Sequence, residues 1–78
     1  MDNELLLNID KLHTTKLGVN RIKNNLSISG NVVTYCKNLI LKSNCEILKK
    51  GKNWYCTIDG IKITINSNTY TIITAHRL

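Results

Sequence analysis

The dipeptide Asp59-Gly60, between two runs of alternating apolar and polar residues, constrains this chain more than any other feature. Both central residues of a type I′ turn need positive φ, and Asp-Gly supplies them, so the sequence predicts a two-residue β-hairpin. The register then follows residue by residue. It pairs Ile58 with Ile61, Cys56 with Ile63, and Trp54 with Ile65. These six side chains form an apolar face, which removes Trp54 from the functional candidates. The intervening residues form a polar face with Tyr55, Thr57, Lys62 and Thr64.

A second turn is predicted at Ser67-Asn68, which adds another strand that runs to His76. With a two-residue loop, Ile65 pairs with Tyr70 and Ile63 with Ile72. The loop length decides which side chains reach the polar face, because a slip of one residue moves every side chain to the other side of the sheet. The two-residue loop places Thr71, Ile73 and Ala75 on the polar face. A three-residue loop would instead bring Thr74 and His76 there.

The first forty residues show helical periods. A first helix is predicted from Asp2 or Asn3 to about Leu12, with Leu5, Ile9 and Leu12 as its inner stripe. Thr14 or Thr15 is expected to cap a second helix that buries Val19, Ile22 and Leu26. Ser27 or Ser29 is expected to cap a third helix over residues 31–41. A first strand at residues 45–50 then turns back through Gly51 and Lys52 into Trp54.

These elements predict an α+β fold, with two or three N-terminal helices packed on one face of a four-stranded antiparallel β-meander. The 78 residues, which contain no proline, are interpreted as a single domain, with a helical half at 1–43 and the sheet at 44–78. A domain of this size has little room for an enclosed active site. A ligand is therefore expected on the open face of the sheet, in a shallow groove or at a homodimer interface.

The chain has 11 Lys and Arg against 5 Asp and Glu, a net charge of +6. This charge favours nucleic acid, RNA before DNA, or an acidic protein as the partner. Because nine of the eleven are Lys, in a chain also rich in Asn and Ile, an A/T-rich genome is an alternative source of the charge.

Three widely spaced cysteines, Cys36, Cys45 and Cys56, show neither a disulfide framework nor zinc-ligand spacing. They are interpreted as reduced thiols in apolar surroundings. No metal or cofactor is indicated. No apolar run approaches the length of a membrane span, so a cytoplasmic protein with no membrane association is expected.

Basic, aromatic and hydroxyl side chains gather on the predicted polar face and around its turns, where they could bind nucleic acid. The candidates are Lys49, Lys50, Lys52, Tyr55, Lys62, Thr64 and Arg77. A solvated hairpin that protects a sheet edge is the plainer interpretation of the lysines.

The chain also contains the groups that metal-independent RNA cleavage needs. His13 and His76 could exchange protons with the ribose and the leaving oxygen, and Arg21 could stabilise the anionic transition state. Thr74 completes this candidate catalytic set. The alternatives are a capping or exposed role for His13 and a terminal, non-catalytic position for His76.

The motifs NIDKLHTTKLG (8–18), RIKNNL (21–26), KGKNWY (50–55) and YTIITAH (70–76) resemble those of a family of short bacterial proteins known as domain of unknown function 3781. More distantly, the chain is similar to the barnase, EndoU, colicin and RelE-like superfamily of RNases, which place helices before a four-stranded antiparallel sheet. That resemblance implies His13 and Arg21 as a first catalytic pair, with Thr71, Thr74 and His76 from the last strand.

The leading hypothesis is a small RNA-directed protein, in its enzymatic form a toxin-like endoribonuclease. The alternative is a binding module without catalysis, such as a phage or mobile-element inhibitor that docks on a host nuclease or defence complex. A structural homodimer through the open face or a free sheet edge is a third interpretation.

Overall fold

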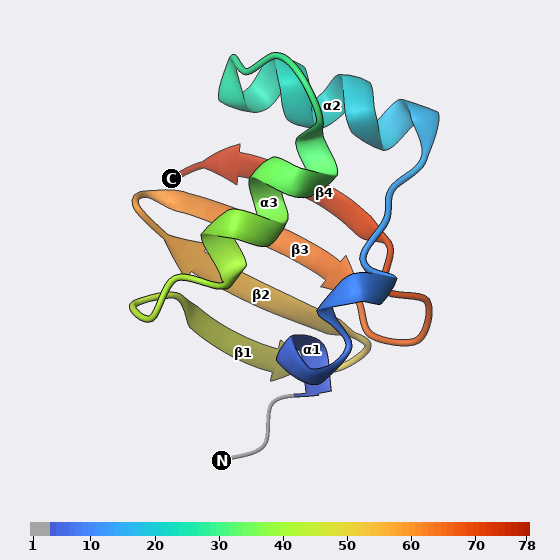
Figure 1. Cartoon of the computed structure of the whole chain (residues 1–78), viewed down its shortest axis with the longest axis vertical. Coiled ribbons are helices and arrows are strands. Elements are labelled where there is room, and N and C mark those ends of the chain that lie inside the picture. The colour runs from blue at the N-terminus through green and yellow to red at the C-terminus, as the bar shows by residue number, and fades with distance from the viewer. Residues whose placement is uncertain (1–3) are drawn as a thin grey trace.

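A computed structural model of the chain describes residues 4–78, and its elements follow the predicted order of helices before strands. The helices are α1 (Glu4–Leu7), the 3-10 turn η1 (Ile9–Lys11), α2 (Lys16–Leu26) and α3 (Val32–Ile40). The strands are β1 (Glu46–Lys50), β2 (Asn53–Ile58), β3 (Ile61–Asn66) and β4 (Ile72–Arg77). The sheet is an antiparallel meander in the order β1-β2-β3-β4, with the helices on one face (Figure 1). The predicted α+β class is confirmed.

The first predicted helix is interrupted. α1 ends before Asn8, where the Glu4 carbonyl oxygen accepts from both the side-chain amide (3.0 Å) and the backbone amide (3.1 Å) of Asn8. The expected inner stripe nevertheless forms, with Leu5 and Leu12 buried and Ile9 partly buried. The predicted N-caps Asp2 and Asn3 lie outside the described residues.

The next two helices begin at side-chain caps. Thr15 Oγ1 accepts from the Gly18 amide at 3.1 Å, as predicted for α2. The cap of α3 is Asn31, whose Oδ1 accepts from the Thr34 amide at 3.0 Å, and not Ser27 or Ser29. Ser27 instead ends α2 in the left-handed conformation, with φ of 55°.

The hairpin of β2 and β3 has the predicted register, including Trp54 opposite Ile65 and Ile58 opposite Ile61. Asp59 and Gly60 have φ values of 51° and 74°, as a type I′ turn requires. The apolar face of this hairpin packs under the helices and forms most of the core together with Ile22, Leu26, Cys36 and Ile40.

The second hairpin differs from the prediction in both loop and register. Its loop has four residues, 67–70, because Asn66 Oδ1 accepts from the amides of Asn68 and Thr69 and Tyr70 adopts a φ of 61°. A β-bulge then places Ile73 and Thr74 on the same side, so that Ile72 and Ala75 both point into the core. The predicted pairs of Ile65 with Tyr70 and Ile63 with Ile72 are wrong. Ile65 lies opposite Ile72, and Ile63 lies opposite Ala75.

Helix α2 lies along the outer edge of β4 (Figure 1). Thr14 Oγ1 donates to the Ile72 carbonyl oxygen at 2.8 Å, and Asn25 Nδ2 donates to that of Ala75 at 3.2 Å. Arg77 donates to the Leu26 carbonyl oxygen at 3.0 Å. These bonds satisfy polar groups at one edge of the sheet and tie the helical half to the last strand.

Gly18 tests this contact between α2 and β4. In an open helix, Gly→Ala stabilises by up to about 1 kcal/mol. Here the new Cβ would overlap Thr14 Oγ1, which would have to leave its bond to Ile72. We expect Gly18→Ala to lower the free energy of unfolding in the wild-type background. In a Thr14→Ala background the same change should be neutral or stabilising. Urea unfolding of the four proteins measures this coupling, and equal effects in the two backgrounds would contradict it.

Candidate functional site

The face of the sheet opposite the helices carries three cross-strand rows of side chains. Residues directly opposite each other in an antiparallel sheet lie on the same face, so the register defines each row. The first row is Glu46, Thr57, Lys62 and His76. The second row is Leu48, Tyr55, Thr64 and Thr74. The third row is Lys50, Asn53 and Asn66. We call this surface the open face.

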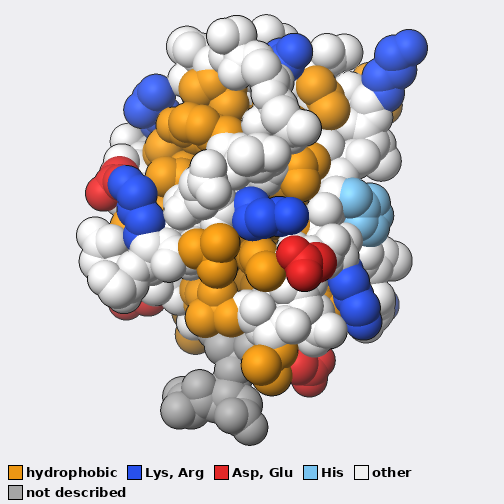
Figure 2. All heavy atoms as spheres, viewed as in Figure 1, with side chains coloured by type: hydrophobic (Ala, Val, Ile, Leu, Met, Phe, Trp, Pro, Cys, Tyr) orange, Lys and Arg blue, Asp and Glu red, His pale blue; other side chains and the backbone are white. Residues whose placement is uncertain are grey.

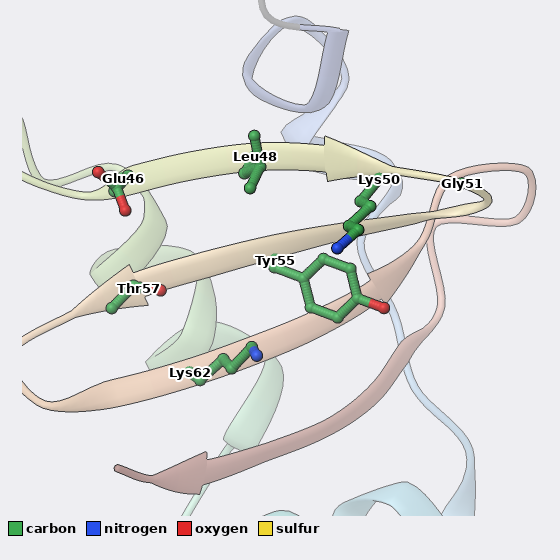
Figure 3. A pocket seen from close by; sticks show the side chains of 7 residues that line it. All are labelled: Glu46, Leu48, Lys50, Gly51, Tyr55, Thr57 and Lys62. Atoms are coloured by element: carbon green, nitrogen blue, oxygen red, sulfur yellow. The ribbon is translucent and has the colours of Figure 1, made fainter.

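A shallow hollow of about 490 Å³ lies on the open face, over β1 and β2 and reaching Lys62 of β3 (Figure 3). Tyr55 projects into it, with Lys50 on one side and Lys62 on the other. Lys62 Nζ lies 5.0 Å from the centroid of the Tyr55 ring, a cation–π distance. Asn53 Nδ2 lies 3.4 Å from the Tyr55 hydroxyl. The hollow therefore combines an aromatic ring with two cations. Its lining is Glu46, Leu48, Lys50, Gly51, Tyr55, Thr57 and Lys62.

Of the predicted nucleic-acid-binding residues, Lys50, Tyr55, Lys62 and Thr64 lie together on the open face. Lys49 does not, because it is paired with the buried Trp54 and so lies on the helix-covered face. Lys52 is exposed in the β1–β2 turn. Arg77 reaches towards the helices, where it binds the end of α2. On the helix-covered face, basic side chains stand apart between apolar ones and form no continuous patch (Figure 2).

His13 has a defined structural position beside the start of β4. Its backbone pairs with this strand through the His13 amide to Tyr70 oxygen (3.2 Å) and the Ile72 amide to His13 oxygen (2.7 Å). Both ring nitrogens are in hydrogen-bond contact, Nδ1 with the Lys11 carbonyl oxygen at 2.9 Å and Nε2 with Thr71 Oγ1 at 3.1 Å. Thr71 in turn bonds Thr69 at 2.7 Å. The ring therefore joins the N-terminal segment to the last hairpin.

The four predicted catalytic residues do not meet at one point. His76 lies opposite Lys62 on the open face, five residues along the chain from Thr71, the neighbour of His13. At roughly 3.3 Å per residue that is about 16 Å of strand. Thr74 lies on the open face too, where its Oγ1 is 3.4 Å from Asn25 Nδ2. Arg21 is exposed on α2, one helical turn before Asn25.

Sequence reasoning missed three residues of the hollow, Glu46, Leu48 and Gly51. The signal for them was available, because Glu46, Leu48 and Lys50 alternate along β1 and the turn at Gly51 fixes their side of the sheet. Gly51 has a φ of 62°, the geometry of a II′ turn whose first central residue is glycine.

The three cysteines are free thiols on the opposite side of the sheet from the hollow. Burial raises the pKa of Cys36 to about 11 and that of Cys56 to about 12, from an ordinary value of 9.0. Burial also raises the pKa of Cys45, which shares a hydrogen bond with Cys56. Neutral thiols are poor nucleophiles and poor metal ligands. Within residues 4–78 no group of three or more His, Cys, Asp or Glu side chains could hold a metal ion.

The family model for DUF3781, described as a protein of unknown function, matches residues 6–76. The chain belongs to the DUF3781 family. Searches of curated proteins and of solved structures gave no match, so the more distant similarity to RNases has no support from a solved structure. Over the described part of this DUF3781 protein, no helix is long and apolar enough to cross a membrane.

Because burial raises the pKa of Cys36 and Cys56, we expect the free energy of unfolding to fall at alkaline pH. Their pKa is higher in the folded than in the unfolded protein, so they stabilise the fold fully below about pH 9 and lose this effect as pH rises towards 11–12. Each such thiol should reduce the free energy of unfolding by about 1.4 kcal/mol per pH unit in that interval. We expect Cys36→Ala to flatten the decline. Urea unfolding from pH 8 to 10.5 under reducing conditions measures it, and parallel curves for the two proteins would refute the assignment.

Proposed function

We propose that this DUF3781 protein binds single-stranded RNA on the open face of its sheet. The observation that supports this most directly is the Tyr55 ring in a hollow between Lys50 and Lys62. A base can stack on an aromatic ring whatever its identity, while the lysines neutralise neighbouring phosphates. The hollow is open and shallow, which suits a strand lying across a sheet better than an enclosed small molecule.

Hydroxyl groups on the same face support RNA over DNA as the ligand. Thr57 lies two residues from Tyr55 along β2, Thr64 lies opposite Tyr55 on β3, and Thr74 follows on β4. Each hydroxyl can donate to or accept from a ribose 2′-hydroxyl, the group that distinguishes RNA from DNA. Lys52 adds a further cation at the exposed tip of the β1–β2 hairpin, beside the hollow.

Binding has better geometric support than cleavage. A metal-independent cleavage reaction needs an acid and a base within hydrogen-bond reach of one phosphate group. His13 and His76 are separated along β4, and both ring nitrogens of His13 already have partners. His76, by contrast, lies beside Lys62 on the open face, where it can contact a bound phosphate. We therefore assign His76 to the binding surface.

Lys50 and Lys49 offer a matched test, because they are neighbours with the same charge on opposite faces of β1. We expect Lys50→Ala to weaken binding to an unstructured RNA oligonucleotide, and Lys49→Ala to leave it nearly unchanged. The slope of log K against log salt should fall by about 0.7 for each lost phosphate contact with a single strand. Fluorescence anisotropy at several salt concentrations measures both quantities. Equal losses for the two variants would mean that net charge alone drives binding.

Tyr55 tests the stacking component. Loss of one stacked base costs about 1–3 kcal/mol of binding free energy. Tyr55→Ala should lower RNA affinity by that amount and leave the salt slope unchanged. Tyr55→Phe keeps the ring and loses only the contact with Asn53, so it should bind almost as the wild type does. Thermal unfolding of both variants serves as the control for folding. An undiminished affinity in Tyr55→Ala would exclude stacking on this ring.

The same RNA, recovered after incubation in EDTA, separates binding from catalysis. We expect intact RNA. Cleavage by the wild type that disappears in His76→Ala would replace the binding proposal with an endoribonuclease. A lack of RNA affinity at low salt, together with nuclease-resistant capture of a stoichiometric protein, would overturn RNA binding in favour of a protein-directed inhibitor.

A further inference from the structure

Strand β1 is one of the two edge strands of the sheet, and within residues 4–78 only β2 pairs with it. The other edge strand, β4, lies against α2. The two-residue turn at Gly51 and Lys52 closes on a hydrogen-bonded pair, Lys50 and Asn53, and such pairs alternate along an antiparallel ladder. The backbone groups of Glu46, Leu48 and Lys50 therefore point to β2. Those of Ile47 and Lys49 point outward, ready to pair with another strand.

We infer that two copies of this chain pair through their β1 strands, antiparallel, about a two-fold axis at Leu48. In that register Ile47 lies opposite Lys49 of the second copy, and Lys49 lies opposite Ile47. These are the residues whose amide and carbonyl groups point outward, so each pair exchanges two hydrogen bonds. The contact is isologous and closes at a dimer.

In this register the side chains of β1 in one copy complement those of β1 in the second copy. On the open face, Glu46 of each copy lies opposite Lys50 of the other, which gives two oppositely charged cross-strand pairs. Between them Leu48 meets Leu48 of the second copy, and this side chain is 59% exposed in the single chain. A strand carrying lysines alone would repel a second copy, as edge lysines commonly do. Glu46 removes that obstacle.

Neighbouring antiparallel registers lack this complementarity. A shift in one direction places Lys49 opposite Lys49 of the second copy, and like charges directly opposite are destabilising. The opposite shift places Glu46 against Leu48 and leaves Lys50 beyond the end of the partner strand. Backbone hydrogen bonding allows all three registers, because each pairs residues whose backbone groups point outward. The side-chain charges select the register centred on Leu48.

Pairing would join the two sheets into one of eight strands and bring the two hollows side by side. Glu46, Leu48 and Lys50 line the hollow of each copy, so each copy would supply part of the border of the other (Figure 3). In Figure 1 and Figure 3 the ribbon of α1 lies near β1, which makes α1 the described helix nearest to this edge. The pairing rests on β1 alone and does not depend on RNA binding.

Sedimentation velocity of the full chain without RNA, over a range of concentrations at low salt, tests the dimer. We expect a reversible monomer–dimer equilibrium. Glu46→Lys and Lys50→Glu should each weaken the dimer by roughly tenfold, because two attractive pairs become repulsive. The double variant Glu46→Lys/Lys50→Glu restores the pairs with reversed signs and should dimerise within about threefold of the wild type. Lys16→Glu, on α2, is the matched control and should have no effect.

Lys49→Pro tests the pairing without a charge reversal, in case the charge-reversed variants fold poorly. Lys49→Pro removes an outward amide but none that bonds β2, as edge strands tolerate. It should be monomeric with an unchanged far-UV spectrum. A wild type that is monomeric at all concentrations, or a double variant no better than either single one, would overturn the inference. Because RNA is absent, these results leave the proposed function untouched.

Discussion

The positive φ angles of Asp59 and Gly60 hold β2 and β3 in one register, and both faces of the sheet depend on that register. Every second residue of the hairpin is buried, so a slip of one position would turn one strand over. It would expose either Trp54, Cys56 and Ile58 of β2 or three isoleucines of β3, and it would bury the polar residues of the same strand. The core and the open face are therefore specified by a single turn.

For the last strand, β4, local sequence patterns are not sufficient to predict which side chains face the core. Alternation predicts that Ala75 lies on the polar face, but the bulge moves it into the core and brings Thr74 and His76 to the open face. The bulge coincides with contacts from the other half of the chain, since Thr14 bonds Ile72 and Asn25 bonds Ala75. Partners separated by 58 and 50 residues leave no periodic signal in the sequence. The sequence therefore predicted the strand but not its register.

The same distinction between local patterns and long-range contacts applies to the residues of the candidate site. Lys50, Tyr55, Lys62 and Thr64 were predictable because turn geometry and a period of two place them on one face. The same period of two places Lys49 on the face opposite to Lys50, since adjacent residues of a strand point to opposite faces. The position of His13 against Thr71 and the contact of Arg77 with Leu26 depend on how the helical half packs, which periodicity does not specify.

Strand β1 carries Glu46, the carboxylate that borders the hollow on the open face. Asp59, at the turn between β2 and β3, is paired with Lys42 at 2.9 Å and does not line the hollow. Glu46 is the carboxylate that lines the hollow, and it lies on the edge strand β1. A polyanion lying over Tyr55 and Lys62 would be repelled at that end and directed towards β3 and β4. A second copy approaching the free edge would meet the same carboxylate as an attraction. Glu46 and Lys50 therefore belong to both proposals, because they line the hollow proposed to bind RNA and pair with each other across the proposed dimer.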